Sequence, residues 1–217
     1  MPKSTVYNID ALQYMRNLPD NAFSLCIADP PYGLGDKLVI GGSWAKRYQE
    51  KGASWDKPIT KEYFDEIFRI SEHWIIWGGN YYIPYIPSAR HFIVWRKPWM
   101  EGMKTMSNCE IAFSNFDTNA RCVDFNRESD ARIHVCQKPK ALYSWLLKTY
   151  HNTGGGVFDP FLGSGSSRIA AYNLGIDFIG CERDKEYYDL QEKRFKEQCL
   201  GEHLTQNGQT IKQLSLF

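Results

Sequence analysis

The sequence lacks the features of several protein classes. None of its six cysteines stands in a C-x-x-C pair, and no histidine spacing completes a zinc site. No stretch approaches the roughly 18–20 apolar residues of a membrane span. The first ten residues contain no apolar signal-peptide core. We therefore expect a reduced, soluble, cytoplasmic protein that has no metal and no membrane contact.

The sequence also has little excess charge, with 26 Lys and Arg against 25 Asp and Glu in 217 residues. A balanced total does not exclude nucleic acid as a partner, because a local basic face is what binds phosphate. With 43% hydrophobic residues, the chain can bury one good core and is too short for two. We expect most of the aromatic residues, 15% of the total, to lie in that core.

What the chain does contain is an alternation of short apolar runs with helical patterns, which is typical of an α/β sheet with parallel strands. Helices are expected at 10–18, from an N-cap at Thr60 to Ser71, at 140–150, at 166–174 ending before Gly175, and at 184–198. The seven expected strands are Thr5–Ile9, Ser24–Ala28, Trp74–Trp77, Phe92–Trp95, Ile111–Phe113, Gly156–Phe158 and Phe178–Cys181.

Two stretches do not fit the alternation. Residues 34–58 are rich in glycine and basic residues, and residues 115–137 are polar and hold three arginines. Long irregular segments in a compact domain are usually functional loops. We therefore predict one domain over residues 1–200, with these two segments as loops, and a polar tail over residues 201–217.

The first motif is Asp29-Pro30-Pro31-Tyr32, directly after an expected strand. Two prolines keep the backbone extended and remove two N–H donors, so the Pro30 carbonyl stays free to accept a hydrogen bond. Asp29 adds an anionic acceptor and Tyr32 adds a flat face, at the strand end where α/β sheets bind ligands. An amino group could be held there, although the same residues also occur by chance in turns.

The second motif is a strand, a glycine-rich turn and a helix over residues 157–167. Gly163 and Gly165 let the backbone approach a ligand, and the N–H groups of the following helix point at it. A third feature is Glu182, a carboxylate at the end of the next strand and about 20 residues past the turn, where a ribose diol is gripped in such folds. Alone, Glu182 would be interpreted as a solvated strand end or a helix cap.

Together these residues resemble the β group of DNA amino-methyltransferases, in which the D-P-P-Y motif precedes the D-P-F-x-G-x-G cofactor loop. The resemblance covers roughly residues 5–196 and includes the segments 8–12, 73–82, 92–98 and Gln137-Lys138-Pro139. It implies a Rossmann-like, seven-stranded, mostly parallel methyltransferase sheet with permuted motif order. The cofactor-binding residues it implies are Asp10, Ala11, Asp29, Lys138, Asp159, Pro160, Phe161, Gly163, Ser164, Gly165, Ser166, Glu182 and Arg183.

The activity implied is transfer of a methyl group from S-adenosylmethionine to a flipped base in DNA, in a bacterial or phage-infected cell. The catalytic residues would be Asp29, Pro30, Pro31 and Tyr32. Adenine N6 is favoured because cytosine enzymes of this group more often begin the tetrad with serine. Cytosine N4, an RNA substrate and a non-catalytic DNA-binding or clamp-binding relative stay open as alternatives.

Contacts to DNA would come from local basic clusters, although charge runs are usually solvated loops. No large separate target-recognition domain is visible, which leaves stringent sequence specificity in doubt. His134-Val135-Cys136 and Ser166-Ser167 depart from the usual family pattern. The expected DNA-contacting residues are Lys37, Lys46, Arg47, Lys51, Lys57, Arg121, Arg127 and Arg132.

The last five residues, Gln213-Leu214-Ser215-Leu216-Phe217, resemble the short peptide by which bacterial replication proteins dock on the sliding clamp. A glutamine, a central leucine and a Leu-Phe pair suit an apolar groove with one polar anchor. The alternative is an ordinary terminus. Clamp docking and homodimer formation are thus two expectations about partners, besides DNA.

Overall fold

The computed structural model describes residues 1–35, 56–102, 107–128, 132–134, 136–151, 154–204 and 210–212, the last two short strands by backbone alone. The described strands are β1 (Ser4–Tyr7), β2 (Phe23–Ala28), β3 (Ser71–Trp77), β4 (His91–Arg96), β5 (Cys109–Ser114), β6 (Arg121–Asp124), β7 (Val157–Asp159), β8 (Phe178–Cys181), β9 (Glu202–Leu204) and β10 (Thr210–Lys212). The described helices are α1 (Ala11–Met15), α3 (Lys61–Ile70), α4 (Lys140–Tyr150), α5 (Ser166–Asn173) and α6 (Lys185–Cys199), with short 3-10 turns η3 (Gly79–Tyr81) and η4 (Pro98–Met100).

Eight strands form one sheet in the order β1-β8-β7-β2-β3-β5-β4-β6. Only β5 runs antiparallel to its two neighbours, so the sheet is mostly parallel, as predicted. All seven expected strands are present. The eighth, β6, falls inside the stretch 115–137 and pairs with the edge of β4. Sequence reasoning missed it because it has four residues, mostly exposed, and no apolar run.

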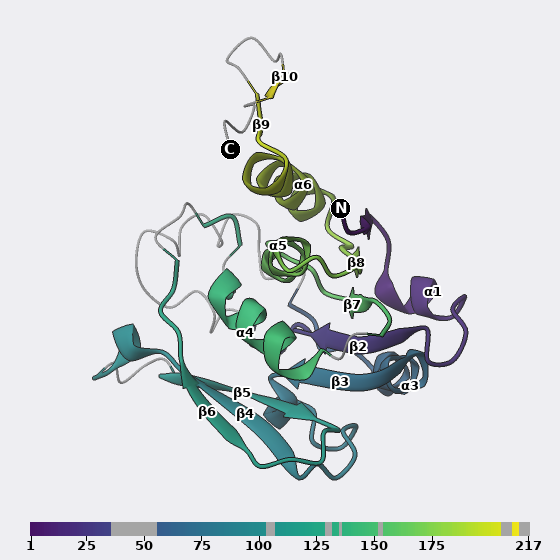
Figure 1. Ribbon diagram of the computed structural model, residues 1–217. Helices are drawn as coiled ribbons and strands as arrows, with labels where there is room; N and C mark the ends of the chain where they lie inside the picture. The colour runs from purple at the N-terminus through teal and green to yellow at the C-terminus, as the bar shows by residue number, and fades with distance from the viewer. Residues whose placement is uncertain are drawn as a thin grey trace.

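Helices cover both faces of the sheet, and Figure 1 shows them on either side of β2 and β3. One apolar core lies between the strands and α4 and α5, and the other lies between the strands and α1 and α3. Strand β2 is buried at every position, which explains its continuous apolar sequence. No helix among the described residues is long and apolar enough to cross a membrane.

Helix ends follow the capping residues seen in the sequence. The carboxylate of Asp10 accepts a hydrogen bond from the Leu12 amide, and that of Asp184 accepts from two amides in the first turn of α6. Gly175 follows α5 with a positive φ of 73°, a backbone conformation that favours glycine. Thr60 stands at the N-cap of α3 but makes no side-chain cap bond.

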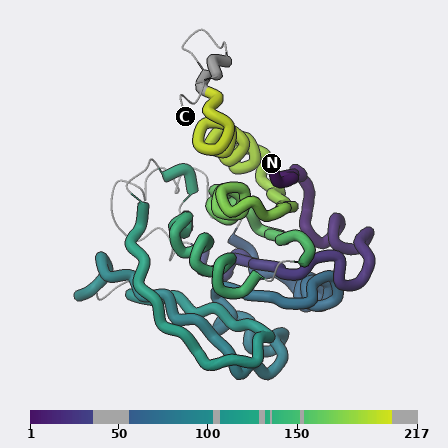
Figure 2. Tube along the Cα trace, in the orientation of Figure 1, coloured from purple at the N-terminus to yellow at the C-terminus, as the bar shows by residue number. Residues whose placement is uncertain are grey.

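The first and the last strand of the large sheet in chain order lie side by side. Strand β1 pairs in parallel with β8, so Ser4 faces Phe178 and Tyr7 faces Cys181. Figure 2 shows the purple N-terminal segment beside the late, yellow-green part of the chain. This pairing brings the residues that follow β1 to the same sheet edge as those that follow β8.

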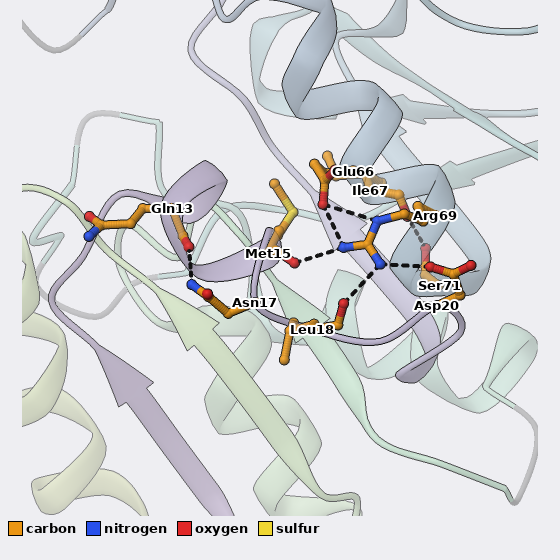
Figure 3. A network of polar contacts seen from close by, with 9 residues as sticks. All are labelled: Gln13, Met15, Asn17, Leu18, Asp20, Glu66, Ile67, Arg69 and Ser71. Atoms are coloured by element: carbon orange, nitrogen blue, oxygen red, sulfur yellow. Dashed lines mark hydrogen bonds and ion pairs between the residues drawn. The ribbon is translucent and has the colours of Figure 1, made fainter.

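Helix α1 ends at Met15, three residues before the predicted end at Leu18, because the chain turns there into β2. Figure 3 shows the side chain of Arg69 filling this turn. Its Nη2 donates to the Met15 carbonyl (2.9 Å) and to Glu66 (2.7 Å), and its Nη1 donates to the Leu18 carbonyl (2.8 Å) and to Asp20 (2.7 Å). A side chain of α3 therefore fixes the start of β2.

Arg69→Met should lower the free energy of unfolding by about 1–2 kcal/mol, because two backbone carbonyls and two carboxylates lose a charged donor at a partly exposed site. Urea titration would measure the loss. Arg16→Met is the matched control: it breaks an ion pair whose side chains are 58% and 63% exposed, and it should change stability little. Equal effects of the two substitutions would contradict this role for Arg69.

Candidate active site

A cavity of about 300 Å³ lies at the carboxyl ends of the parallel strands β1, β8, β7 and β2. Its volume is at the lower end of the range for small-molecule sites. Strands β2 and β7 are direct neighbours, with Leu25 facing Val157 and Cys26 facing Phe158. The segments that follow them, residues 29–32 and the turn after 159, therefore line one cavity.

The tetrad at residues 29–32 is held by contacts to its backbone. The Tyr82 hydroxyl donates to the Pro31 carbonyl, and the amides of Gly33 and Gly35 donate to Asp56 (2.9 and 2.7 Å). No described residue donates to the Pro30 carbonyl, so this acceptor is available to a ligand. These hydrogen bonds hold the extended backbone of the tetrad, which its two prolines predict, in one position.

Asp29 is engaged on both carboxylate oxygens. The Tyr32 hydroxyl donates to Oδ1 (2.7 Å), and the Lys138 ammonium lies 2.5 Å from Oδ2. Burial raises the pKa of Asp29 and Glu110 adds to this effect, whereas Lys138 opposes it. Burial and Asp29 together hold the pKa of Tyr32 well above its usual value, so Tyr32 is a neutral phenol that can donate.

A second carboxylate, Glu110, lies behind this pair. It stands on β5 two residues before Ala112, the first residue of β5 that pairs with β3. Its oxygens lie 3.0 Å from Lys138 and 2.5 Å from Lys97. Burial opposes ionisation of Glu110, but the two ammonium groups outweigh it and hold its pKa at about 2. Burial likewise disfavours the charged form of Lys138, yet Asp29 and Glu110 raise its pKa.

The buried carboxylate of Asp159 holds the glycine-rich turn through hydrogen bonds. Its carboxylate accepts from the Phe161 amide (2.9 Å) and from the Ser167 hydroxyl (2.5 Å). Gly163 and Gly165 have φ values of 52° and 73°, as a turn of this shape requires. Asp159 and Gly165 do not line the cavity, although both were predicted to touch a cofactor. They shape the turn, and their contact with a cofactor stays a prediction.

Two more carboxylates line the cavity at the ends of β8 and β1. Glu182 accepts from the amides of Gly163 (2.8 Å) and Asp184 (2.8 Å), one on each oxygen. Burial raises the pKa of Glu182, and these two amides oppose the rise. Asp10 accepts from the Tyr63 hydroxyl (2.7 Å), and Arg183 lies 3.7 Å from the same oxygen.

The structure brings together most of the residues predicted for the site. All four tetrad residues line the cavity, as do ten further residues of the predicted cofactor set: Asp10, Ala11, Lys138, Pro160, Phe161, Gly163, Ser164, Ser166, Glu182 and Arg183. Their roles stay predictions.

Sequence reasoning missed several other residues of the site. Asp56 and Tyr63 come from segments with no recognised motif, and Glu110 was left just outside an expected strand. The signal for Glu110 was a charge inside an apolar run. His134, which precedes the Gln-Lys-Pro segment, also lines the cavity; burial, aided by Lys138 and Arg132, lowers its pKa to about 4, so its ring is neutral.

The predicted DNA contacts are only partly described. Lys57 is exposed and lines the cavity, whereas Arg121 and Arg127 are exposed on and after β6 and Arg132 is half-buried. The remaining predicted residues, Lys37, Lys46, Arg47, Lys51 and Gln213–Phe217 (Gln213, Leu214, Ser215, Leu216 and Phe217), lie outside the described residues.

Comparison with known proteins identifies the family of this chain. A family model for DNA methylases, of the N6/N4 type, matches residues 70–193, which is more than half of the chain. The chain belongs to this DNA methylase family. Its members are S-adenosylmethionine-dependent amino-methyltransferases. The match begins after residues 29–32, so the place of the tetrad in the site rests on the geometry above.

Individual relatives of this DNA methylase are distant. The type II methyltransferase M.HinfI of Haemophilus influenzae is 23% identical over 89% of this chain and 68% of its own length. The crystal structure of the M1.HpyAVI complex with S-adenosylmethionine has a TM-score of 0.61 and 22% identity, and the likeness covers 90% of this chain and 99% of that one. PvuII DNA methyltransferase, which is cytosine-N4-specific, has a TM-score of 0.61 and 12% identity, over 90% and 87% of the two chains. These structures share the fold.

The cavity of this methylase fits S-adenosylmethionine, the cofactor of the family. Ile9, Phe161 and Tyr63 offer apolar and aromatic surface for a flat base. Asp10 and Glu182 are acidic acceptors at the ends of adjacent strands, and each carboxylate oxygen has a second lone pair beyond the bonds it already accepts. Such acceptors suit a ribose diol and an amine.

The buried carboxyl of Asp159 generates a pH prediction. Burial raises its pKa to about 7, although Ser167 and Phe161 oppose this. The folded protein thus keeps a proton that the unfolded chain, with a pKa of about 4, releases. Its contribution to stability is present below about pH 4 and is lost as the pH rises toward 7.

Asp159→Asn removes this titration while an amide can still bond Ser167 and Phe161. The free energy of unfolding of the variant relative to wild type should therefore rise between pH 5 and pH 8, as measured by urea titration. Asp117→Asn on the surface controls for the loss of one carboxylate, since Asp117 is 85% exposed. Parallel curves for Asp159→Asn and wild type would show that Asp159 does not titrate in this range.

Proposed function

We propose that this methylase transfers a methyl group to adenine N6 in DNA, after the base has left the duplex. The observation that carries the proposal is the shared cavity: the tetrad at residues 29–32 and the turn at 159–167 follow neighbouring parallel strands and line one space. A methyl donor on the turn side and an amine on the tetrad side would therefore lie within reach of each other. Methylation of an amine requires this proximity.

The tetrad supplies two acceptors and one flat face. Asp29 and the Pro30 carbonyl can each accept one N–H of an exocyclic amine, which directs the nitrogen lone pair away from both. Tyr32 offers its ring to the base, and stacking offsets part of the few kcal/mol that extrusion from the duplex costs. S-adenosylmethionine supplies an electrophilic methyl group when bound. Asp29, a mostly shielded carboxylate whose pKa is raised by desolvation, can take the proton that the methylated amine loses.

Adenine is favoured over cytosine by the identity of Asp29, since cytosine-N4 relatives more often carry serine there. The fold does not separate the two, because a cytosine-N4-specific enzyme shares it. The segments 34–58 and 115–137 are proposed to contact the duplex. Lys57, at the end of the first segment, is exposed and lines the cavity, so its charge can meet a phosphate near the extruded base.

The test is to sequence modified bases in DNA from methylation-deficient cells that express either the wild type or Asp29→Ala. The wild type should leave N6-methyladenine in this DNA. Asp29→Ala should leave none, because the amine loses its anionic acceptor, while the variant still unfolds in one cooperative urea transition. Detection of N4-methylcytosine in place of N6-methyladenine would show that cytosine is the target base. Full activity of Asp29→Ala would overturn the role of Asp29.

The tail carries a separate proposal, that residues 213–217 dock this methylase on a sliding clamp. Its support is the match of Gln213, Leu216 and Phe217 to an apolar groove with one polar anchor. The β9–β10 hairpin just before these residues extends from the end of α6, away from the sheet (Figure 1).

Deletion of residues 213–217 should abolish capture of the protein on immobilised clamp and leave methylation of short DNA duplexes unchanged. Gln206→Ala, a polar change just ahead of the peptide, is a matched control that should keep capture. Equal capture of the deletion variant and the wild type would end the clamp proposal.

A further inference from the structure

The ammonium of Lys138 lies in a closed cage rather than in open solvent. The residue is 3% exposed, and its ammonium contacts Asp29 (2.5 Å) and Glu110 (3.0 Å). It also lies 5.2 Å from the centre of the Trp77 ring and 5.9 Å from that of Tyr32, within reach of cation–π attraction. The family resemblance implied a contact from Lys138 to the cofactor. In the structure its charge is directed at the tetrad, and a contact to the cofactor stays a prediction.

The charges around Asp29 make this cation necessary. Asp29 and Glu110, whose side chains are 16% and 22% exposed, share the buried Lys138, and two shielded carboxylates near each other cannot both ionise without a compensating cation. The other titratable groups that face Asp29 supply no positive charge: they are Tyr32, Tyr82, Cys136, Tyr143 and Asp159. Lys138 is thus the cation in direct contact with Asp29 among the described residues.

Glu110 gives Lys138 a second partner. When an amine N–H reaches Asp29, it binds an oxygen that already accepts from Lys138 or Tyr32, through the second lone pair of that oxygen. Lys138 can then shift toward Glu110 without losing its counter-charge. Lys97, which lies 2.5 Å from Glu110, keeps that carboxylate ionised from the opposite side. Positive and negative side chains therefore alternate along the chain of ion pairs formed by Lys97, Glu110, Lys138 and Asp29.

We propose that Lys138 is a positioning residue that keeps Asp29 in its ionised, amine-accepting form, and that Glu110 holds Lys138 in place for this task. Lys138 acts through Asp29 and does not touch the reacting atoms. A carboxylate accepts hydrogen bonds only, whereas a protonated Asp29 would present an O–H donor to the amine and lose an acceptor. The inference rests on the proposed amine methylation. It adds the residues that determine the lowest pH at which methyl transfer proceeds.

The experiment is the pH dependence of methyl transfer to duplex DNA, measured as kcat and KM for DNA from pH 5.5 to 9 for wild type and three variants. In Lys138→Met, loss of the cation raises the pKa of Asp29. The acidic limb of kcat should move about one to three pH units upward, a usual size for one neighbouring charge. Lys138→Arg keeps the charge and should restore the limb toward wild type.

The double variant Lys138→Met/Glu110→Gln also removes the negative charge of Glu110, which repels that of Asp29. Its acidic limb should lie below that of Lys138→Met, because Asp29 then ionises next to one fewer anion. A merely structural role for Lys138 would lower kcat equally at every pH and would make the double variant worse than the single one. Either of those results would overturn the inference.

A second readout needs no bound cofactor and no activity. The free energy of unfolding of Lys138→Met relative to wild type should fall as the pH rises from 5 to 8. Without its cation, Asp29 has a raised pKa in the folded protein, and such a group contributes less to stability as the pH rises. A difference independent of pH would count against the inference. If the wild type methylates no DNA base while this pH-dependent difference is present, the proposed function fails and the charge arrangement stands.

Discussion

The parallel pairing of β2 with β7 is the constraint on which the site depends. Residues 29–32 and 159–167 are separated by more than 120 positions in the chain, yet they follow two strands that exchange hydrogen bonds. Strands β8 and β1 continue the same direction, so four strand ends deliver their following residues to one edge. In open α/β sheets the carboxyl edge is where ligands bind, and here it also brings acidic and glycine-rich segments together.

Burial then determines what each acidic group at this edge can do. Glu110 lies beside two ammonium groups and stays ionised, whereas Asp159 has only a hydroxyl and an amide as partners, and its pKa rises. Asp29 lies between these extremes, with one cation and one phenol. Three carboxyl groups of similar intrinsic acidity thus acquire different protonation behaviour from their neighbours alone.

Sequence patterns predicted the strands, the tetrad and the glycine turn because these features are local. An apolar run bounded by turns, or a glycine between a strand and a helix, is visible within ten residues. Glu110 and Asp56 escaped because their roles arise from contacts across the sheet or across a long loop. β6 escaped because a short edge strand gains its stability from pairing and not from its own composition.

The same limit applies to Lys138. Its segment was recognised, and it does line the cavity, but the direction of its ammonium depends on how far β5 continues past β3. Register of this kind is set by tertiary packing. The sequence could place Lys138 near the site but could not say whether its partner was a ligand or another side chain.

Asp56 has a consequence for how this protein could diversify. Its carboxylate receives the amides of Gly33 and Gly35, so the two ends of a segment of about 20 residues are joined by hydrogen bonds beside the tetrad. A segment tied at its base can change in composition, and even in length, at little cost in closure entropy. Selection could therefore rewrite the residues between these anchors while the chemistry next to them stays in register.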